Sequence, residues 1–163
     1  MDMDLQSYLF DTTVFNTFLK HPHKGDVETL RGKGHFYVTH FQRDELWATP
    51  ESKTKGNLLS LFYAIAPKQV ATKTSVIGYS KLGAAELSDG VIFNEILSGL
   101  NECERKRGKK RKDNRKDALI GETAERNGYI MVSDDRCLCK VMCSRGVHVM
   151  DWNTFNSTIS AGS

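Results

Sequence analysis

Residues 117–135 read DALIGETAERNGYIMVSDD, and this run sets the fold of the chain more firmly than any other. Positions 118–127 have the residue types and spacing of a helix, and Gly128 stands where a glycine commonly follows the last helical residue. The apolar run 129–132 predicts a short buried strand that leads into Ser133, Asp134 and Asp135. A helix, a strand and a polar loop in this order predict one unit of an α/β sheet.

The same alternation continues on both sides of this run. Short apolar stretches predict strands at residues 7–10, 35–40, 70–77, 129–132 and 147–150. Apolar spacing predicts helices from Thr12 or Thr13 to Pro22, from about 43–45, and at 57–66, 87–104, 118–127 and 136–144. We therefore expect an α/β fold: a three-layer α/β/α sandwich with a central, mainly parallel sheet, formed as a single domain over residues 1–163.

The composition is that of an ordinary globular domain. The chain has 163 residues, of which 39% are hydrophobic and 26% are charged. No apolar stretch approaches the ~20 residues needed to cross a membrane, so no membrane partner is expected. The start, Met1-Asp2-Met3-Asp4, is acidic, whereas a secretory signal needs a basic flank and a longer apolar core. We expect a cytoplasmic protein.

The four cysteines are Cys103, Cys137, Cys139 and Cys143. In a reducing cytosol they are expected to be free thiols. Their spacing lacks the repeated C-x-x-C pairs of structural zinc sites. Cys139 and Cys143 are four residues apart, as neighbours on one helix face are, and free cysteine is among the most buried residue types. Buried thiols are therefore favoured over structural zinc.

A concentrated basic segment occupies residues 105–116. It holds nine basic residues and one acid, so the rest of the chain carries a net charge of −5 (the total of +3 minus +8). Such a segment suits contact with a nucleic-acid backbone, and a solvated loop is an equally weighted alternative. The candidate contact residues are Arg105, Lys106, Arg107, Lys109, Lys110, Arg111, Lys112, Arg115 and Lys116.

Four acids stand near the C-terminal ends of predicted strands or the starts of helices. Asp11 follows the first strand, Glu45 the second and Asp135 the strand at 129–132, while Asp117 directly precedes a helix. Right-handed crossovers place the C-terminal ends of parallel strands at one edge, so these acids can meet there. Clustered carboxylates repel one another unless a cation neutralises them, and a hard divalent cation suits oxygen ligands. Taken singly, Asp117 or Asp135 is more simply explained by the positive end of a helix.

Four segments, in the same order, resemble those of PIN domains. Residues 11–15 (DTTVF) are similar to their Asp-Thr-Asn/Ser-Val-Leu opening, and residues 39–46 (THFQRDEL) to the segment that ends in Glu-Leu. Residues 117–124 (DALIGETA) resemble the helix Asp-x-Leu-Ile-Ala-x-x-Ala. Residues 128–135 (GYIMVSDD) resemble the ending Gly-x-x-Leu-Val-Thr-x-Asp. The resemblance covers nearly the whole chain.

This resemblance implies a metal site. The implied catalytic and Mg²⁺- or Mn²⁺-binding residues are Asp11, Glu45, Asp117 and Asp135, with Thr12 and Ser133 as supporting hydroxyl residues. Asp44 is the alternative to Glu45, and Asp134 the alternative to Asp135. The chain departs from the family pattern at Thr13, where Asn or Ser is common. It also has a longer stretch between the second and third acids than small toxin-type members do.

The resemblance implies a metal-dependent endoribonuclease, and many members of the family are toxins of toxin–antitoxin pairs. It thus implies RNA as substrate, an antitoxin protein as partner and a homodimer. A metal held by carboxylates lowers the pKa of bound water and shields phosphate charge, which suits hydrolysis that leaves a 5′ phosphate. The alternatives are a catalytically silent RNA-binding or interaction module of the same fold and a DNA-directed nuclease.

Other signals carry less weight. A receiver domain requires an acidic pair after the first strand, and a haloacid-dehalogenase phosphatase requires Asp-x-Asp, whereas position 13 is Thr. His21 and His23 are expected to be surface histidines rather than metal ligands. Trp47 and Trp152 are expected in the core or at its rim, and Phe93 in the core rather than in a base-stacking platform.

Overall fold

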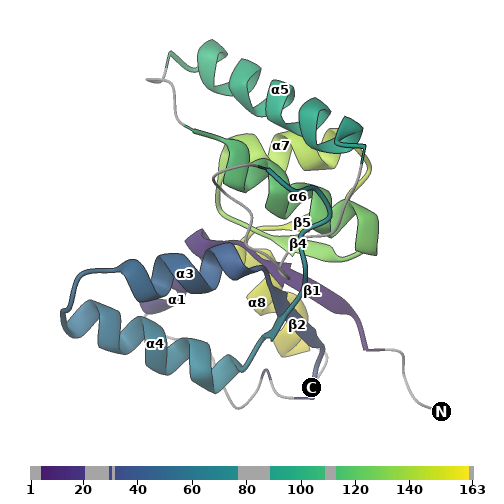
Figure 1. Cartoon of the computed structure of the whole chain (residues 1–163). Helices are drawn as coiled ribbons and strands as arrows, with labels where there is room; N and C mark the ends of the chain where they lie inside the picture. Colours follow the sequence, from purple (N-terminus) through teal and green to yellow (C-terminus); the bar gives the residue numbers. More distant parts are fainter. Residues whose placement is uncertain (1–4, 21–29, 31, 77–88, 109–112, 162–163) are drawn as a thin grey trace.

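A computed structural model of the chain describes residues 5–20, 30, 32–76, 89–108 and 113–161 (Figure 1). These residues contain a five-stranded sheet with the order β3-β2-β1-β4-β5, in which every neighbouring pair is parallel. The strands are β1 (Ser7–Phe10), β2 (His35–Val38), β3 (Lys68–Gln69), β4 (Ile130–Val132) and β5 (Val149–Met150). The described helices are α1 (Thr12–Lys20), α3 (His40–Ala48), α4 (Lys53–Ile65), α5 (Val91–Lys106), α6 (Arg115–Asn127), α7 (Arg136–Ser144) and α8 (Trp152–Ala161).

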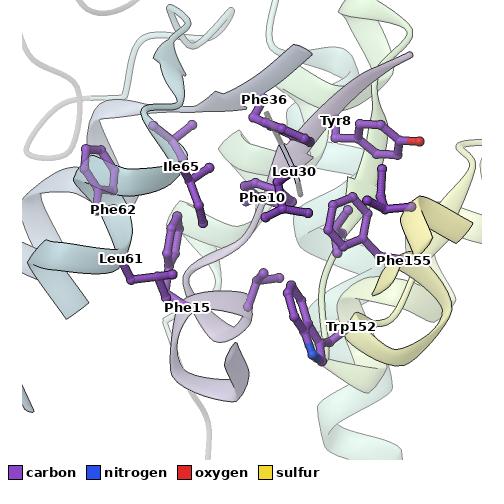
Figure 2. Packing of buried hydrophobic residues seen from close by; sticks show 14 of the residues in the cluster. Tyr8, Phe10, Phe15, Leu30, Phe36, Leu61, Phe62, Ile65, Trp152 and Phe155 are labelled. Carbon is purple, nitrogen blue, oxygen red and sulfur yellow. The ribbon is translucent and has the colours of Figure 1, made fainter. Parts of the chain in front are cut away.

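The side chains of β1 divide the core into two layers because successive residues of a strand point to opposite faces. Tyr8 and Phe10 join a cluster formed with α1, α4 and α8, and Figure 2 shows Phe10 in it beside Phe155. Leu9 joins the other cluster, formed mainly with α5, α6 and α7. Figure 1 shows these three helices together on one side of the sheet. The predicted three-layer α/β/α sandwich with a parallel sheet is therefore confirmed.

The strand predicted at residues 70–77 is wrong in position. β3 covers only Lys68–Gln69, and it pairs with Tyr37 and Val38 of β2. β2 ends at Val38, which pairs with Gln69, and its ladder with β3 ends there. Val70 still donates its N–H to the carbonyl oxygen of Val38 at 2.8 Å, and Val70 and Val76 pack on the second cluster. Residue 77 lies outside the described residues.

The helix predicted from about residues 43–45 begins earlier, at His40. Thr39 caps it: the Thr39 hydroxyl accepts the N–H of Phe41, and the Gln42 side chain accepts the N–H of Thr39 at 2.9 Å. Gln42 also donates through Nε2 to the carbonyl oxygen of Phe10 at 2.7 Å. These bonds connect the start of α3 to Phe10, the last residue of β1, which directly precedes Asp11.

The prediction of four free thiols is wrong. Cys103 on α5 and Cys137 on α7 form a disulfide, with Cα atoms 5.8 Å apart. The two helices pack against each other, which the 34-residue separation in sequence does not reveal. Cys139 and Cys143 are free; Cys143 is exposed rather than buried. Burial raises the pKa of the Cys139 thiol to about 11, so this thiol stays protonated at neutral pH.

We expect reduction of this disulfide to lower the free energy of unfolding by about 2–4 kcal/mol. A cross-link over 34 residues removes loop-closure entropy from the unfolded chain. Urea unfolding with and without a dithiol reductant measures the difference. In Cys103→Ser the reductant is expected to have no effect, and in Cys143→Ser it should act as in the wild type. An unfolding free energy that reductant leaves unchanged in the wild type contradicts the prediction.

No described helix has the length and apolar character that a membrane-spanning segment requires.

Candidate metal centre at the sheet edge

A cavity of about 880 Å³ lies at the C-terminal ends of the central strands. Asp11 enters it from the end of β1, Glu45 from α3, Asp117 from the first turn of α6, and Asp135 from the cap of α7. The structure therefore brings the four acids selected from the sequence to one cavity. The described residues that line it are Asp11, Thr12, Thr13, Asn16, Phe41, Asp44, Glu45, Ala48, Asp113, Lys116, Asp117 and Asp135.

Asp11 is the buried acid of this cavity, with 4% of its surface exposed. Its Oδ1 accepts the N–H of Thr12 at 2.7 Å. Its Oδ2 accepts the hydroxyls of Thr13 at 2.8 Å and Ser133 at 2.9 Å. The backbone N–H of Asp11 donates to the carbonyl oxygen of Val132 at 2.9 Å, which locks the residue between β1 and β4. Its carboxylate is therefore held in one orientation.

Burial raises the pKa of the Asp11 carboxyl above its usual value. The hydrogen bonds from Thr13, Ser133 and Thr12 lower this pKa, and the negative charge of Asp135 raises it further. The protein thus surrounds a carboxylate with donors suited to its charged form while removing it from water. A nearby cation would favour the charged form.

Ser133 and Thr13 link the two central loops. The Ser133 hydroxyl donates to Asp11 and accepts the N–H of Asp135 at 3.1 Å, so it spans both acids. The Thr13 hydroxyl donates to Asp11 and accepts the N–H of Asp134 at 3.2 Å. The resemblance to PIN domains implied a supporting role for Ser133, whereas Thr13 was noted only as a departure from the family pattern. The signal for Thr13 was its hydroxyl two residues after the acid, which reaches back to that acid as in a local side-chain turn.

Glu45 is held by two partners. Its Oε2 accepts the Thr12 hydroxyl at 2.6 Å, and its Oε1 lies 3.4 Å from Nζ of Lys116. Thr12, the other supporting residue selected from the sequence, thus bonds Asp11 through its backbone and Glu45 through its side chain. Asp44 lines the same cavity and lies 3.7 Å from a guanidinium nitrogen of Arg43. Glu45 and its alternative, Asp44, therefore both line the cavity.

Asp134 and Asp135 differ in where they lie. Asp135 lines the cavity, and its Oδ1 caps α7 by accepting the N–H groups of Cys137 and Leu138, both at 2.9 Å. Asp134 is not among the lining residues, and its Oδ1 accepts the N–H of Trp152 at 3.0 Å, at the start of α8. The arrangement favours Asp135 over Asp134 as the acid that faces a ligand.

The chemistry of the lining fits a hard divalent cation. Besides its carboxylates, the lining offers the hydroxyls of Thr12 and Thr13 and the side-chain amide of Asn16, and these supply oxygen ligands of the kind Mg²⁺ and Mn²⁺ take. Over the described residues, no three His, Cys, Asp or Glu side chains are grouped closely enough to hold a metal ion as they stand. The carboxylates therefore share a cavity without forming a compact ligand cluster.

The basic segment is described only at its two ends. Arg105 and Lys106 end α5, and Lys106 pairs with Glu102 at 2.7 Å. Arg115 and Lys116 begin α6, and Arg115 lies 4.0 Å from Asp113. Lys109, Lys110, Arg111 and Lys112 lie outside the described residues. Of the candidate nucleic-acid contacts that the structure describes, Lys116 is the one that lines the cavity.

The predictions for Phe93, Trp152 and Trp47 are confirmed. Phe93 and Trp152 are buried in the two clusters. Trp47 is 39% exposed and packs edge-on against Phe62 and Tyr63, so it lies at the rim. His21 and His23 lie outside the described residues.

Solved structures share this fold along nearly the whole chain. PAE2754 from Pyrobaculum aerophilum aligns with a TM-score of 0.56 at 16% identity, covering 99% of both chains. VapBC-1 from nontypeable Haemophilus influenzae aligns with a TM-score of 0.50 at 12% identity, covering 91% of this chain and 99% of that one. No protein-family model and no curated protein matches the sequence. At these identities the likeness concerns the fold, and the fold is the one that the four sequence motifs predicted.

Proposed function

We propose that this chain, a protein of PIN-like fold, is a metal-dependent endoribonuclease and the toxin of a toxin–antitoxin pair. The observation that carries the proposal is the cavity at the sheet edge. The buried and firmly held Asp11 lines this cavity together with Glu45, Asp117 and Asp135. The endoribonuclease chemistry and the toxin role come from the motif resemblance. The fold shared with VapBC-1 is consistent with both.

In this proposal Asp11, Glu45, Asp117 and Asp135 hold Mg²⁺ or Mn²⁺ together with water. The cation, when bound, shields the charge of the phosphate and lowers the pKa of a bound water. The protein fixes the orientation of the carboxylates that would hold the cation. Three donors fix Asp11, and Asp135 is fixed by the two N–H groups of α7 that it caps. Preset ligand geometry of this kind lowers the cost of assembling the reacting groups.

Substrate approach depends on the basic residues. An RNA phosphate entering a cavity lined by carboxylates is repelled by them until a cation neutralises their charge. Arg115 and Lys116, in the first turn of α6, stand at the positive end of a helix next to Asp117, where they can contact the RNA backbone. An antitoxin and a second copy of the chain are the proposed protein partners.

Cleavage assays on RNA and on single- and double-stranded DNA test this function. We expect RNA to be cut in Mg²⁺ or Mn²⁺, with 5′-phosphate ends, and no cleavage in EDTA. Preferential cleavage of DNA would favour the DNA-directed nuclease. RNA binding without cleavage in either metal would favour a catalytically silent module.

Ser133→Ala is expected to reduce kcat/KM for RNA by about 10–100-fold, the usual effect of removing a group that orients metal ligands. The substitution removes the hydroxyl that spans Asp11 and the N–H of Asp135. Steady-state kinetics in Mn²⁺ measure the effect. Ser144→Ala is the matched control, because the Ser144 hydroxyl bonds within its own helix, α7, to the carbonyl oxygen of Val141. Equal activity of the two variants contradicts the role given to Ser133.

A further inference from the structure

Lys116 is unusual among the residues around the cavity. Six carboxylate residues line it, and Lys116 is the only basic residue in the described lining (the six are Asp11, Asp44, Glu45, Asp113, Asp117 and Asp135). Lys116 also stands in the first turn of α6, where the helix dipole disfavours a positive charge. The helix dipole therefore does not explain why position 116 is a lysine. The negative charges of the carboxylates that line the same cavity do explain it.

The partner of Lys116 in the structure is Glu45. The ammonium lies 3.4 Å from Oε1, and the two side chains are 43% and 39% exposed. A pair with this much exposure is weak and easily exchanged. The other oxygen of Glu45 is held at 2.6 Å by the Thr12 hydroxyl, which keeps the carboxylate in place when Lys116 leaves. Glu45 can therefore exchange the ammonium of Lys116 for a divalent cation.

We propose that Lys116 exchanges between two anionic partners at this site. Without a divalent cation it neutralises Glu45, and with the cation bound it is released to contact the RNA phosphate that enters the cavity. This inference rests on the proposed nuclease function and adds to it a residue that couples metal binding to substrate binding. Lysine suits the role because its ammonium is a compact charge on a flexible four-carbon stem.

The exchange predicts that Lys116→Met strengthens Mn²⁺ binding and weakens RNA cleavage. Removal of the competing charge should tighten Mn²⁺ binding to the RNA-free protein by about threefold to fivefold, in keeping with a weak, half-exposed pair. Loss of the phosphate contact should lower kcat/KM for RNA at saturating Mn²⁺ by about tenfold or more. A residue that only stabilises the fold would not tighten metal binding while weakening catalysis.

Isothermal titration with Mn²⁺ and steady-state cleavage of RNA test both predictions on the full chain. Lys53→Met is the matched control, since it removes the same charge from the first turn of another helix, α4, and the exposed Lys53 does not line the cavity. We expect it to change either quantity by less than about twofold, as a surface charge does. Lys116→Arg should keep Mn²⁺ affinity near that of the wild type. In a Glu45→Gln background, Lys116→Met should no longer tighten Mn²⁺ binding.

The outcomes separate the two proposals. If the wild type binds Mn²⁺ and cleaves RNA, but Lys116→Met binds Mn²⁺ no more tightly than Lys53→Met, the exchange is overturned and the nuclease function stands. The exchange is also overturned if Lys116→Met tightens Mn²⁺ binding equally with and without Glu45. If the wild type neither binds Mn²⁺ nor cleaves RNA, both proposals fall.

Discussion

Asp11→Asn is expected to lower kcat/KM for RNA by at least about 10²-fold, beyond the 10–100-fold usual for residues that only support a metal ligand. The substitution keeps the size of the side chain and removes the charge that would bind the cation. Asp11 is the buried acid among the four and the one that three donors hold. Single-turnover cleavage of RNA in Mn²⁺ measures the loss.

A thermal-shift measurement shows whether the loss comes from metal binding. Mn²⁺ at about 100 times its dissociation constant should stabilise the wild type by about 2.7 kcal/mol, which raises Tm by roughly 5–10 °C for a chain of this size. Asp11→Asn should lose most of this rise while keeping a Tm near that of the metal-free wild type. A variant that cleaves RNA as fast as the wild type contradicts the assignment of Asp11.

Phe155→Ala is expected to lower the free energy of unfolding by about 3–5 kcal/mol, as large-to-small substitutions of buried aromatic residues do. Phe155 on α8 is fully buried, and its ring lies 5.1 Å from that of Tyr8 and 5.3 Å from that of Phe10, edge to face in both cases (Figure 2). The substitution would leave a void directly beneath β1, the strand that carries Asp11. Urea unfolding measures the change.

Tyr63→Ala is the control for the loss of an aromatic ring. Tyr63 is 64% exposed on α4, so its truncation is expected to cost less than about 1 kcal/mol. Phe155→Leu, which keeps most of the volume, should fall between the two. Equal stability of Phe155→Ala and Tyr63→Ala would mean that α8 is not part of the core.

The positions of the acids were predictable because parallel topology alone determines where strand ends meet. Once β1 and β4 are recognised, Asp11 and Asp135 must lie at the same edge, and the pairing of Leu9 with Met131 and of Phe10 with Val132 puts them there. Their partners were not predictable in the same way. The contact of Thr12 with Glu45 joins residues 33 apart and depends on how α3 leaves β2.

Some features were present in the sequence but not used. Thr39 and Gln42 have the spacing of a capping box, which marks the start of α3. Trp152, Phe155 and Ile159 have the apolar spacing of a helix, although the intervening Asn, Thr and Ser residues weaken that pattern for α8. The disulfide could not be predicted from the sequence, because Cys103 and Cys137 come together only when α5 packs against α7.

The proposed function requires that a catalytic divalent cation binds in the cavity bounded by Asp11, Glu45, Asp117 and Asp135. A crystal of the protein soaked in Mn²⁺, with anomalous diffraction recorded at the manganese edge, tests it directly. We expect an anomalous peak inside this cavity, within coordination distance of Asp11, and no such peak in Asp11→Asn. Manganese bound only elsewhere, or a cavity without a peak at saturating Mn²⁺, would contradict it.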